Sequence, residues 1–158
     1  MLEVNNIVVD EQGHRYHLDI TAPLYWWSEF DRVASSRPVS HKLDREEFSL
    51  DDFSCEYLND SELVGINGAV EGLTAFDVFR QTIEMLTYYR RSYREDGETE
   101  ADWYQMIQLL PASFNERRVT VLSDKEVSYI LTSYKQFKIR EWHTLGNFLE
   151  EFTAEEKA

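Results

Sequence analysis

The pattern of apolar and polar positions predicts a strand-rich start to the chain. In residues 4–20, apolar residues lead into Glu11-Gln12-Gly13 and then alternate with polar ones, which is typical of a β-hairpin with one buried face. Residues 22–33 repeat apolar side chains at three-residue spacing, so we expect a helix there, with Thr21 as its N-cap. The polar residues 34–42 predict a loop.

The second half of the chain is predicted to be helical, apart from one strand. Thr74, Thr99 and Ser123 are N-capping residues, each placed just before an amphipathic stretch. The predicted elements are helices 75–94, 100–110, 124–137 and 140–152 and a strand over 117–122. A single strand must pair with the distant N-terminal hairpin, so we expect an α/β (α+β) fold with about five helices and a small, mostly antiparallel sheet.

Length and composition favour one globular domain. With 158 residues, of which 42% are hydrophobic and 14% aromatic, the chain can build a core. We expect a single domain over residues 1–153 and a frayed acidic end over 154–158.

Net charge and cysteine content limit the class of partner and the compartment. A net charge of −14 argues against direct binding to nucleic acid or to an anionic membrane surface. The lone Cys55 excludes an internal disulfide. The N-terminus lacks the basic region followed by an apolar stretch that is typical of a signal peptide, so we expect none. No apolar run is long enough to span a membrane. We therefore expect a cytoplasmic protein and no metal site.

An acidic segment suggests a surface for a basic protein partner. Residues 43–71 carry nine Asp and Glu against one Arg, interrupted by apolar residues. Charge would speed the encounter with a basic partner, and aromatic side chains would anchor the contact. The candidate partner-binding residues are Phe48, Asp51, Asp52, Phe53 and Glu56.

The predicted loop over 34–42 is a candidate phosphate-binding segment. Ser35, Ser36 and Arg37 provide hydroxyl groups and a guanidinium, which can donate two parallel hydrogen bonds to a phosphate. The alternative is a solvated connector, because serine and proline are ordinary loop residues. The sequence contains no glycine-rich nucleotide loop, metalloprotease motif or nucleophile elbow.

The stretch from Leu110-Pro111 to Glu126 runs from a helix end through a strand into a capped helix. This order, continued to about Glu150, resembles the second half of the flavin-dependent thymidylate synthases, the ThyX family. The chain is similar to divergent members of this type carried by phages. The resemblance implies the ThyX fold, self-association into a homo-oligomer, and FAD and deoxyuridylate as ligands of an active member.

In the ThyX family an Asn-x-Arg element opens the helix after the strand, where Asn contacts flavin and Arg contacts the deoxyuridylate phosphate. Ser123 and Lys125 stand at these positions, and Tyr134 stands where a second arginine is expected. The family's other signature is rich in Arg, His and Ser. Residues 26–41 occupy its place and retain scattered serines and Arg32. Under the resemblance, Ser35, Ser36, Arg37, Ser123 and Lys125 would line a nucleotide site.

These substitutions favour a non-catalytic relative of the family. Lysine keeps the charge of arginine but loses its two-pronged geometry, and tyrosine loses the charge. The leading hypothesis is therefore an acidic interaction protein of phage type without a cofactor, such as an inhibitor of a host defence protein or nuclease in the host cytoplasm. The alternative is an FAD- and nucleotide-binding enzyme related to the flavin-dependent thymidylate synthases.

Overall fold

The structure is a computed structural model that describes residues 1–10, 14–44, 46–65 and 71–155. The chain divides into two compact units. Unit 1 comprises residues 1–42 and 115–158, and unit 2 comprises residues 43–114. The single domain over 1–153 stays a prediction.

Unit 1 contains an antiparallel sheet of four strands in the order β1-β2-β4-β3. The hairpin predicted over residues 4–20 is confirmed, although its turn at 11–13 lies outside the described residues. The predicted non-local pairing is also confirmed, because β2 pairs with β4 along its whole length, from Arg15 opposite Ser123 to Pro23 opposite Asn115. The strands are β1 (Glu3–Val9), β2 (Arg15–Pro23), β3 (Ser36–Pro38) and β4 (Asn115–Ser123).

The region after the hairpin differs from its prediction. Thr21 does not cap a helix: it lies in β2 opposite Arg117, and the helix α1 (Leu24–Phe30) begins after Pro23. Hydrogen bonds to β4 hold this part of the chain in strand geometry and override the local capping signal. Within the predicted loop 34–42, three residues form the edge strand β3, which pairs with Arg118–Thr120 of β4.

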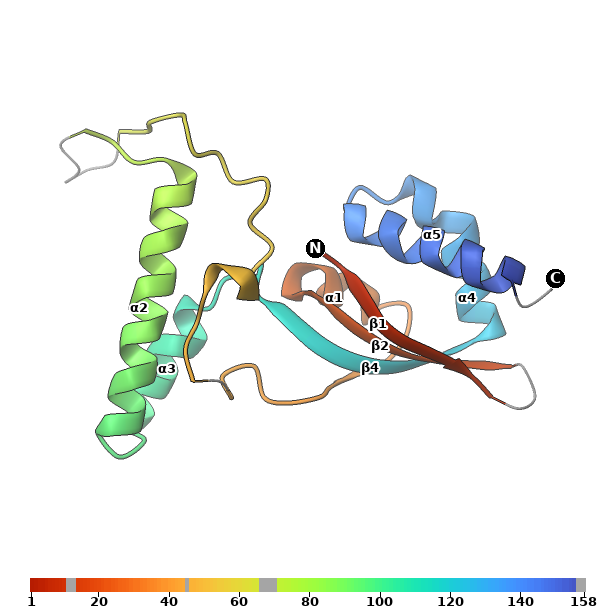
Figure 1. Cartoon of the computed structure of the whole chain (residues 1–158), viewed down its shortest axis with the longest axis horizontal. Helices are drawn as coiled ribbons and strands as arrows, with labels where there is room; N and C mark the ends of the chain where they lie inside the picture. The colour runs from red at the N-terminus through yellow and green to blue at the C-terminus, as the bar shows by residue number, and fades with distance from the viewer. Residues whose placement is uncertain (11–13, 45, 66–70, 156–158) are drawn as a thin grey trace. The chain divides into compact units, whose positions relative to one another are not determined.

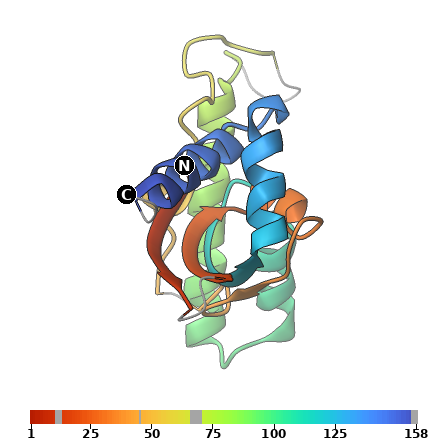
Figure 2. The same ribbon diagram turned by 90° about the vertical axis from the view of Figure 1, so that its right-hand side faces the viewer.

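Helices of unit 1 cover one face of the sheet. The helices are α1, α4 (Asp124–Ser133) and α5 (Arg140–Glu155), and Figures 1 and 2 show α4 and α5 on the same side of the strands. The core joins Leu18, Ile20 and Leu122 of the strands to a cluster of large rings. The largest fully buried side chains of unit 1 are Trp26, Trp27, Trp142, Tyr134 and Phe30.

Two helix ends in unit 1 depart from the predicted bounds. The helix predicted over 124–137 ends at Ser133, and the short 3₁₀ helix η2 (Tyr134–Gln136) follows it. The final helix extends to Glu155, beyond its predicted end at residue 152, and the frayed end stays a prediction. Residues 156–158 of the predicted frayed end lie outside the described residues.

Unit 2 contains η1 (Leu50–Asp52), α2 (Ala75–Glu95) and α3 (Glu100–Leu109). The predicted N-cap Thr74 is confirmed, with its hydroxyl accepting from the backbone N–H of Asp77 at 3.0 Å and the Asp77 carboxylate accepting in return. Gly97, with φ of +80°, lies in the turn between the two long helices. Val64 forms an isolated bridge with Leu73, while residues 66–70 lie outside the described residues.

Candidate functional site

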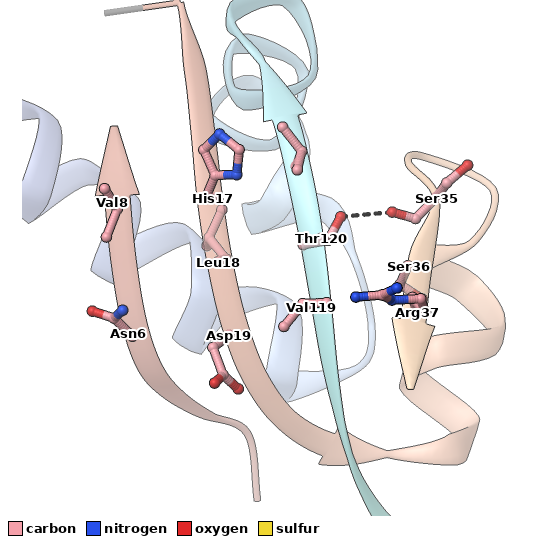
Figure 3. A pocket seen from close by; sticks show the side chains of 11 residues that line it. Asn6, Val8, His17, Leu18, Asp19, Ser35, Ser36, Arg37, Val119 and Thr120 are labelled. Atoms are coloured by element: carbon pink, nitrogen blue, oxygen red, sulfur yellow. Dashed lines mark hydrogen bonds between the residues drawn. The ribbon is translucent and has the colours of Figure 1, made fainter. Parts of the chain in front are cut away.

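The sheet of unit 1 presents a second face that points away from α4 and α5 (Figure 3). Side chains alternate between the faces along each strand, so the burial of Leu18 and Ile20 in the core directs His17 and Asp19 to this second face. The strand register places His17 between Val8 of β1 and Val121 of β4. Both valines are exposed, at 53% and 44%.

A hollow of about 680 Å³ lies on this face. Figure 3 shows side chains from all four strands around it, with Arg37 reaching from β3 toward β4. The volume lies within the range of small-molecule sites in proteins. The residues that line it are Asn6, Val8, His17, Leu18, Asp19, Ser35, Ser36, Arg37, Val119, Thr120 and Val121.

An ion pair sets the charge at the lower edge of this hollow. The Arg117 guanidinium donates from Nε to both carboxylate oxygens of Asp19, at 2.8 and 3.1 Å, and its Nη2 also contacts that carboxylate. These hydrogen bonds lower the pKa of the Asp19 carboxyl below its usual range, against the opposing effect of partial burial. The Asp19 carboxylate is therefore ionised, and the positive charge of Arg117 balances its negative charge. Arg37 adds a further positive charge to the hollow.

A hydrogen-bond network fixes the edge strand that carries Arg37. The Ser36 hydroxyl donates to Asp31 at 2.7 Å and accepts from Nη1 of Arg118 at 3.1 Å. The Thr120 hydroxyl donates to the carbonyl of Ser35 at 2.7 Å, as Figure 3 shows. These contacts hold β3 against β4 although only three of its residues form ladder pairs.

The structure brings together three of the five predicted nucleotide-site residues. Ser35, Ser36 and Arg37 all line the hollow. Ser123 and Lys125 do not line it. Ser36 lies opposite Thr120, so Ser123 is three residues further along β4, which corresponds to about 10 Å.

Ser123 serves as a helix cap. Its hydroxyl accepts from the backbone N–H of Glu126 and donates to the Glu126 carboxylate at 2.7 Å. The first turn of α4 also contains Asp124, which contacts His14 at 3.0 Å. The exposed Lys125 has neither of these acidic neighbours as an ion-pair partner in the described part of the chain. This geometry supports a capping role for Ser123.

Tyr134, at the expected position of a second family arginine, is a core residue. It is 1% exposed, and its hydroxyl donates to Asn147 at 3.0 Å. Its ring packs on Gly146 of α5. The side chain at this position therefore fills the interior and does not face the hollow.

The predicted partner-binding residues separate into two groups. Phe48 and Phe53 are each 5% exposed, and their rings pack with Phe114 in the core of unit 2. These two phenylalanines cannot anchor a partner at the surface, because their rings are buried inside unit 2. Asp51 and Glu56 are exposed, whereas the half-buried Asp52 caps η1 by accepting from the backbone N–H of Ser49.

The sequence prediction missed His17, Asp19 and Asn6 as lining residues of the hollow. The available signal was the alternation in β2, which places polar His17 and Asp19 on the face opposite Leu18 and Ile20. The bulge in β1 between Val4 and Asn6 obscured the matching signal in the first strand.

Comparison with solved structures identifies proteins of similar fold. The structure is similar to thymidylate synthase X (ThyX) from Helicobacter pylori crystallised with FAD and dUMP, with a TM-score of 0.50 and 17% identity. A second Helicobacter pylori ThyX structure with FAD and dUMP gives a TM-score of 0.49 and 17% identity. Each match covers 84% of this chain and 64% of the other, so this chain spans less than two thirds of the neighbour's length.

The first of these matches shows a ThyX-like fold with mixed α/β architecture, as the sequence predicted. No family model and no curated protein matches the chain. Among the described residues, no helix is long and apolar enough to cross a membrane. The same residues contain no group of three or more His, Cys, Asp or Glu side chains that could hold a metal ion together.

Proposed function

We propose that unit 1 binds a small phosphate-bearing ligand in the hollow on the open face of its sheet. The observation that carries the proposal is the convergence of Arg37, Ser35 and His17 on one hollow, with Ser36 fixing the strand that carries Arg37. Because Arg117 balances the negative charge of Asp19, that carboxylate does not compete with a phosphate for the positive charge of Arg37. A guanidinium and an adjacent hydroxyl group, here those of Arg37 and Ser35, suit phosphate oxygens.

The shared fold supports a nucleotide as the ligand. The Helicobacter pylori neighbour contains FAD and dUMP, both of which carry phosphate. The residues present here fit a flavin poorly, because Ser123 stands at the position of the family's flavin-contacting Asn and its hydroxyl is occupied by Glu126. We therefore propose nucleotide binding without flavin chemistry.

Ligand-induced stabilisation tests this proposal. A ligand at a hundred times its dissociation constant stabilises the folded state by about 2.7 kcal/mol. We expect dUMP to raise the melting temperature of the wild type and of Arg32→Ala, a matched control whose exposed arginine follows α1 and does not line the hollow. Arg37→Ala should reduce this stabilisation, because it removes the guanidinium that holds the phosphate. A melting temperature that neither dUMP nor FAD moves would refute the proposal.

The exposed acidic surface of unit 2 favours a second function, binding to a basic protein partner. Asp51 and Glu56 are exposed close in sequence to Tyr57, which is 70% exposed and can replace the buried phenylalanines as an aromatic anchor. A nuclease is one partner of suitable chemistry, because its substrate groove is built to attract phosphates. Inhibition of a host defence nuclease is the specific activity that we propose for this surface.

Charge reversal tests the second function. We expect a basic partner to be retained at low salt by the wild type and by Glu84→Lys, a control on the exposed side of α2. The double variant Asp51→Lys with Glu56→Lys should lose that partner because like charges now face each other. Retention by the double variant, or no salt-sensitive partner for the wild type, would contradict this function.

A further inference from the structure

A second hollow, of about 480 Å³, contains a buried ion pair at its wall. It is separate from the hollow on the open sheet face and is lined by Pro38, Val39, Ser40, His41, Lys42, Glu116 and Arg118. The Glu116 side chain is 7% exposed and the Arg118 side chain 16% exposed. Two nearly buried charged groups that line a cavity need an explanation beyond surface solubility.

Neighbouring groups satisfy only part of this pair. Arg118 donates from Nε to Oε2 of Glu116, and its Nη1 donates to Asp31 and Ser36, each at 3.1 Å. Its guanidinium also lies 5.0 Å from the ring centroid of Trp27. These contacts hold the guanidinium in a single orientation beside the carboxylate.

Two polar atoms of the pair remain available. Oε1 of Glu116 and Nη2 of Arg118 have no hydrogen-bond partner among the described residues. Both atoms remain accessible to solvent. Among the described residues, the side-chain nitrogen or oxygen that is fully buried without a hydrogen-bond partner is Nε1 of Trp26. The pair therefore offers one unpaired acceptor atom and one unpaired donor atom, on side chains that both line the hollow.

The complementary ligand edge has an N–H group next to a C=O group. A primary amide and a lactam place both groups on one edge, whereas a trans peptide bond points them in opposite directions. A charged acceptor and a charged donor strengthen both hydrogen bonds, and burial strengthens them further.

We propose that the hollow lined by Glu116 and Arg118 is a second binding site, which takes a small molecule with a lactam or primary-amide edge. The ligand N–H donates to Oε1 of Glu116, and the ligand C=O accepts from Nη2 of Arg118. This inference goes beyond the phosphate-bearing ligand proposed for the sheet face, because it uses a different hollow and needs no phosphate.

Neutral ligands distinguish this site from the first one. Calorimetric titration of the wild type with uridine, nicotinamide and glutamine identifies whether a nucleobase lactam or a carboxamide is the source of the edge. The matched ligand control is 3-methyluridine, which lacks the N–H donor, and ribose lacks the whole edge. We expect at least one of the first three compounds to bind. Binding of 3-methyluridine as strong as that of uridine, or binding of none of the three, would overturn the proposal.

Glu116→Gln is the matching protein variant. Its amide oxygen can still accept from Nε of Arg118, but its NH₂ group then faces the hollow and opposes the ligand N–H. We expect affinity to fall about tenfold or more, as when a hydrogen bond to a charged group is replaced by two opposed donors. Glu151→Gln, exposed on α5, is the control. Equal affinity of folded Glu116→Gln would overturn the assignment. The wild-type titrations decide the question if the variant does not fold.

Discussion

The ring of Tyr134 lies directly on Gly146 of α5. A Cβ atom added at Gly146 would lie 2.2 Å from Cγ of the ring and 2.4 and 2.5 Å from its Cδ atoms. Tyr134 is 1% exposed and its hydroxyl is hydrogen-bonded to Asn147, so the ring has little freedom to move away. The close approach of η2 to α5 therefore depends on a glycine at position 146.

Gly146→Ala is expected to destabilise unit 1 by overpacking. The extra methyl group must displace a buried ring, which costs about 1–3 kcal/mol. For a chain of this size each kcal/mol lowers the melting temperature by about 2–4 °C. Calorimetric melting checks this, with Gly65→Ala as the control because no atom lies within 4 Å of its added Cβ. Equal melting temperatures for wild type and Gly146→Ala would contradict the packing.

The Asp19–Arg117 pair is expected to contribute to the free energy of unfolding only while the Asp19 carboxyl is ionised. Its hydrogen bonds lower the pKa of Asp19. A carboxyl group with a lowered folded-state pKa contributes stability above its unfolded pKa of about 3.9, and this contribution is lost as the pH falls through the folded-state pKa. Asp19→Asn should therefore be less stable than wild type at pH 6, with the difference shrinking below about pH 4.

Urea unfolding at several pH values measures this dependence on Asp19. Asp60→Asn is the control, since Asp60 is exposed in unit 2. A stability difference between Asp19→Asn and wild type that stays constant from pH 6 to pH 3 would show that the ionised pair is not its source.

Thr74→Ala is expected to loosen the start of α2. The substitution removes the hydroxyl that accepts from the backbone N–H of Asp77. Loss of such a cap costs about 1 kcal/mol. Thr82→Ala is a control within the same helix, where the hydroxyl donates back to the carbonyl of Val78 and alanine has the higher helix propensity. Denaturant midpoints compare the two, and equal effects would argue against the cap.

Lys125→Glu distinguishes an effect on the stability of α4 from a role of Lys125 in ligand binding. A negative charge in the first turn of α4 interacts favourably with the helix dipole, so stability should be unchanged or higher by a few tenths of a kcal/mol. Lys125 does not line the sheet-face hollow, so dUMP binding should be retained. Loss of dUMP binding in a variant of undiminished stability would return Lys125 to the site.

The signals that predicted correctly are local ones. The caps at Thr74, Thr99 and Ser123 depend on residues three positions apart, and all three accept the expected backbone N–H. The alternation in the first hairpin likewise depends on neighbours along one strand. Such patterns identified the helices and most of the sheet, because the physical partners are close in the sequence.

By itself, the sequence determined the α/β class, the positions of the long helices and the need for β4 to pair with the hairpin. Only the tertiary structure decided that Phe48 and Phe53 are buried and that Arg37 and His17 line one hollow. Thr120 and Ser35 are 85 positions apart, yet their hydrogen bond helps to place β3 at the edge of the hollow. No local propensity specifies such a contact, since it exists only after non-local strand pairing has brought the two segments together.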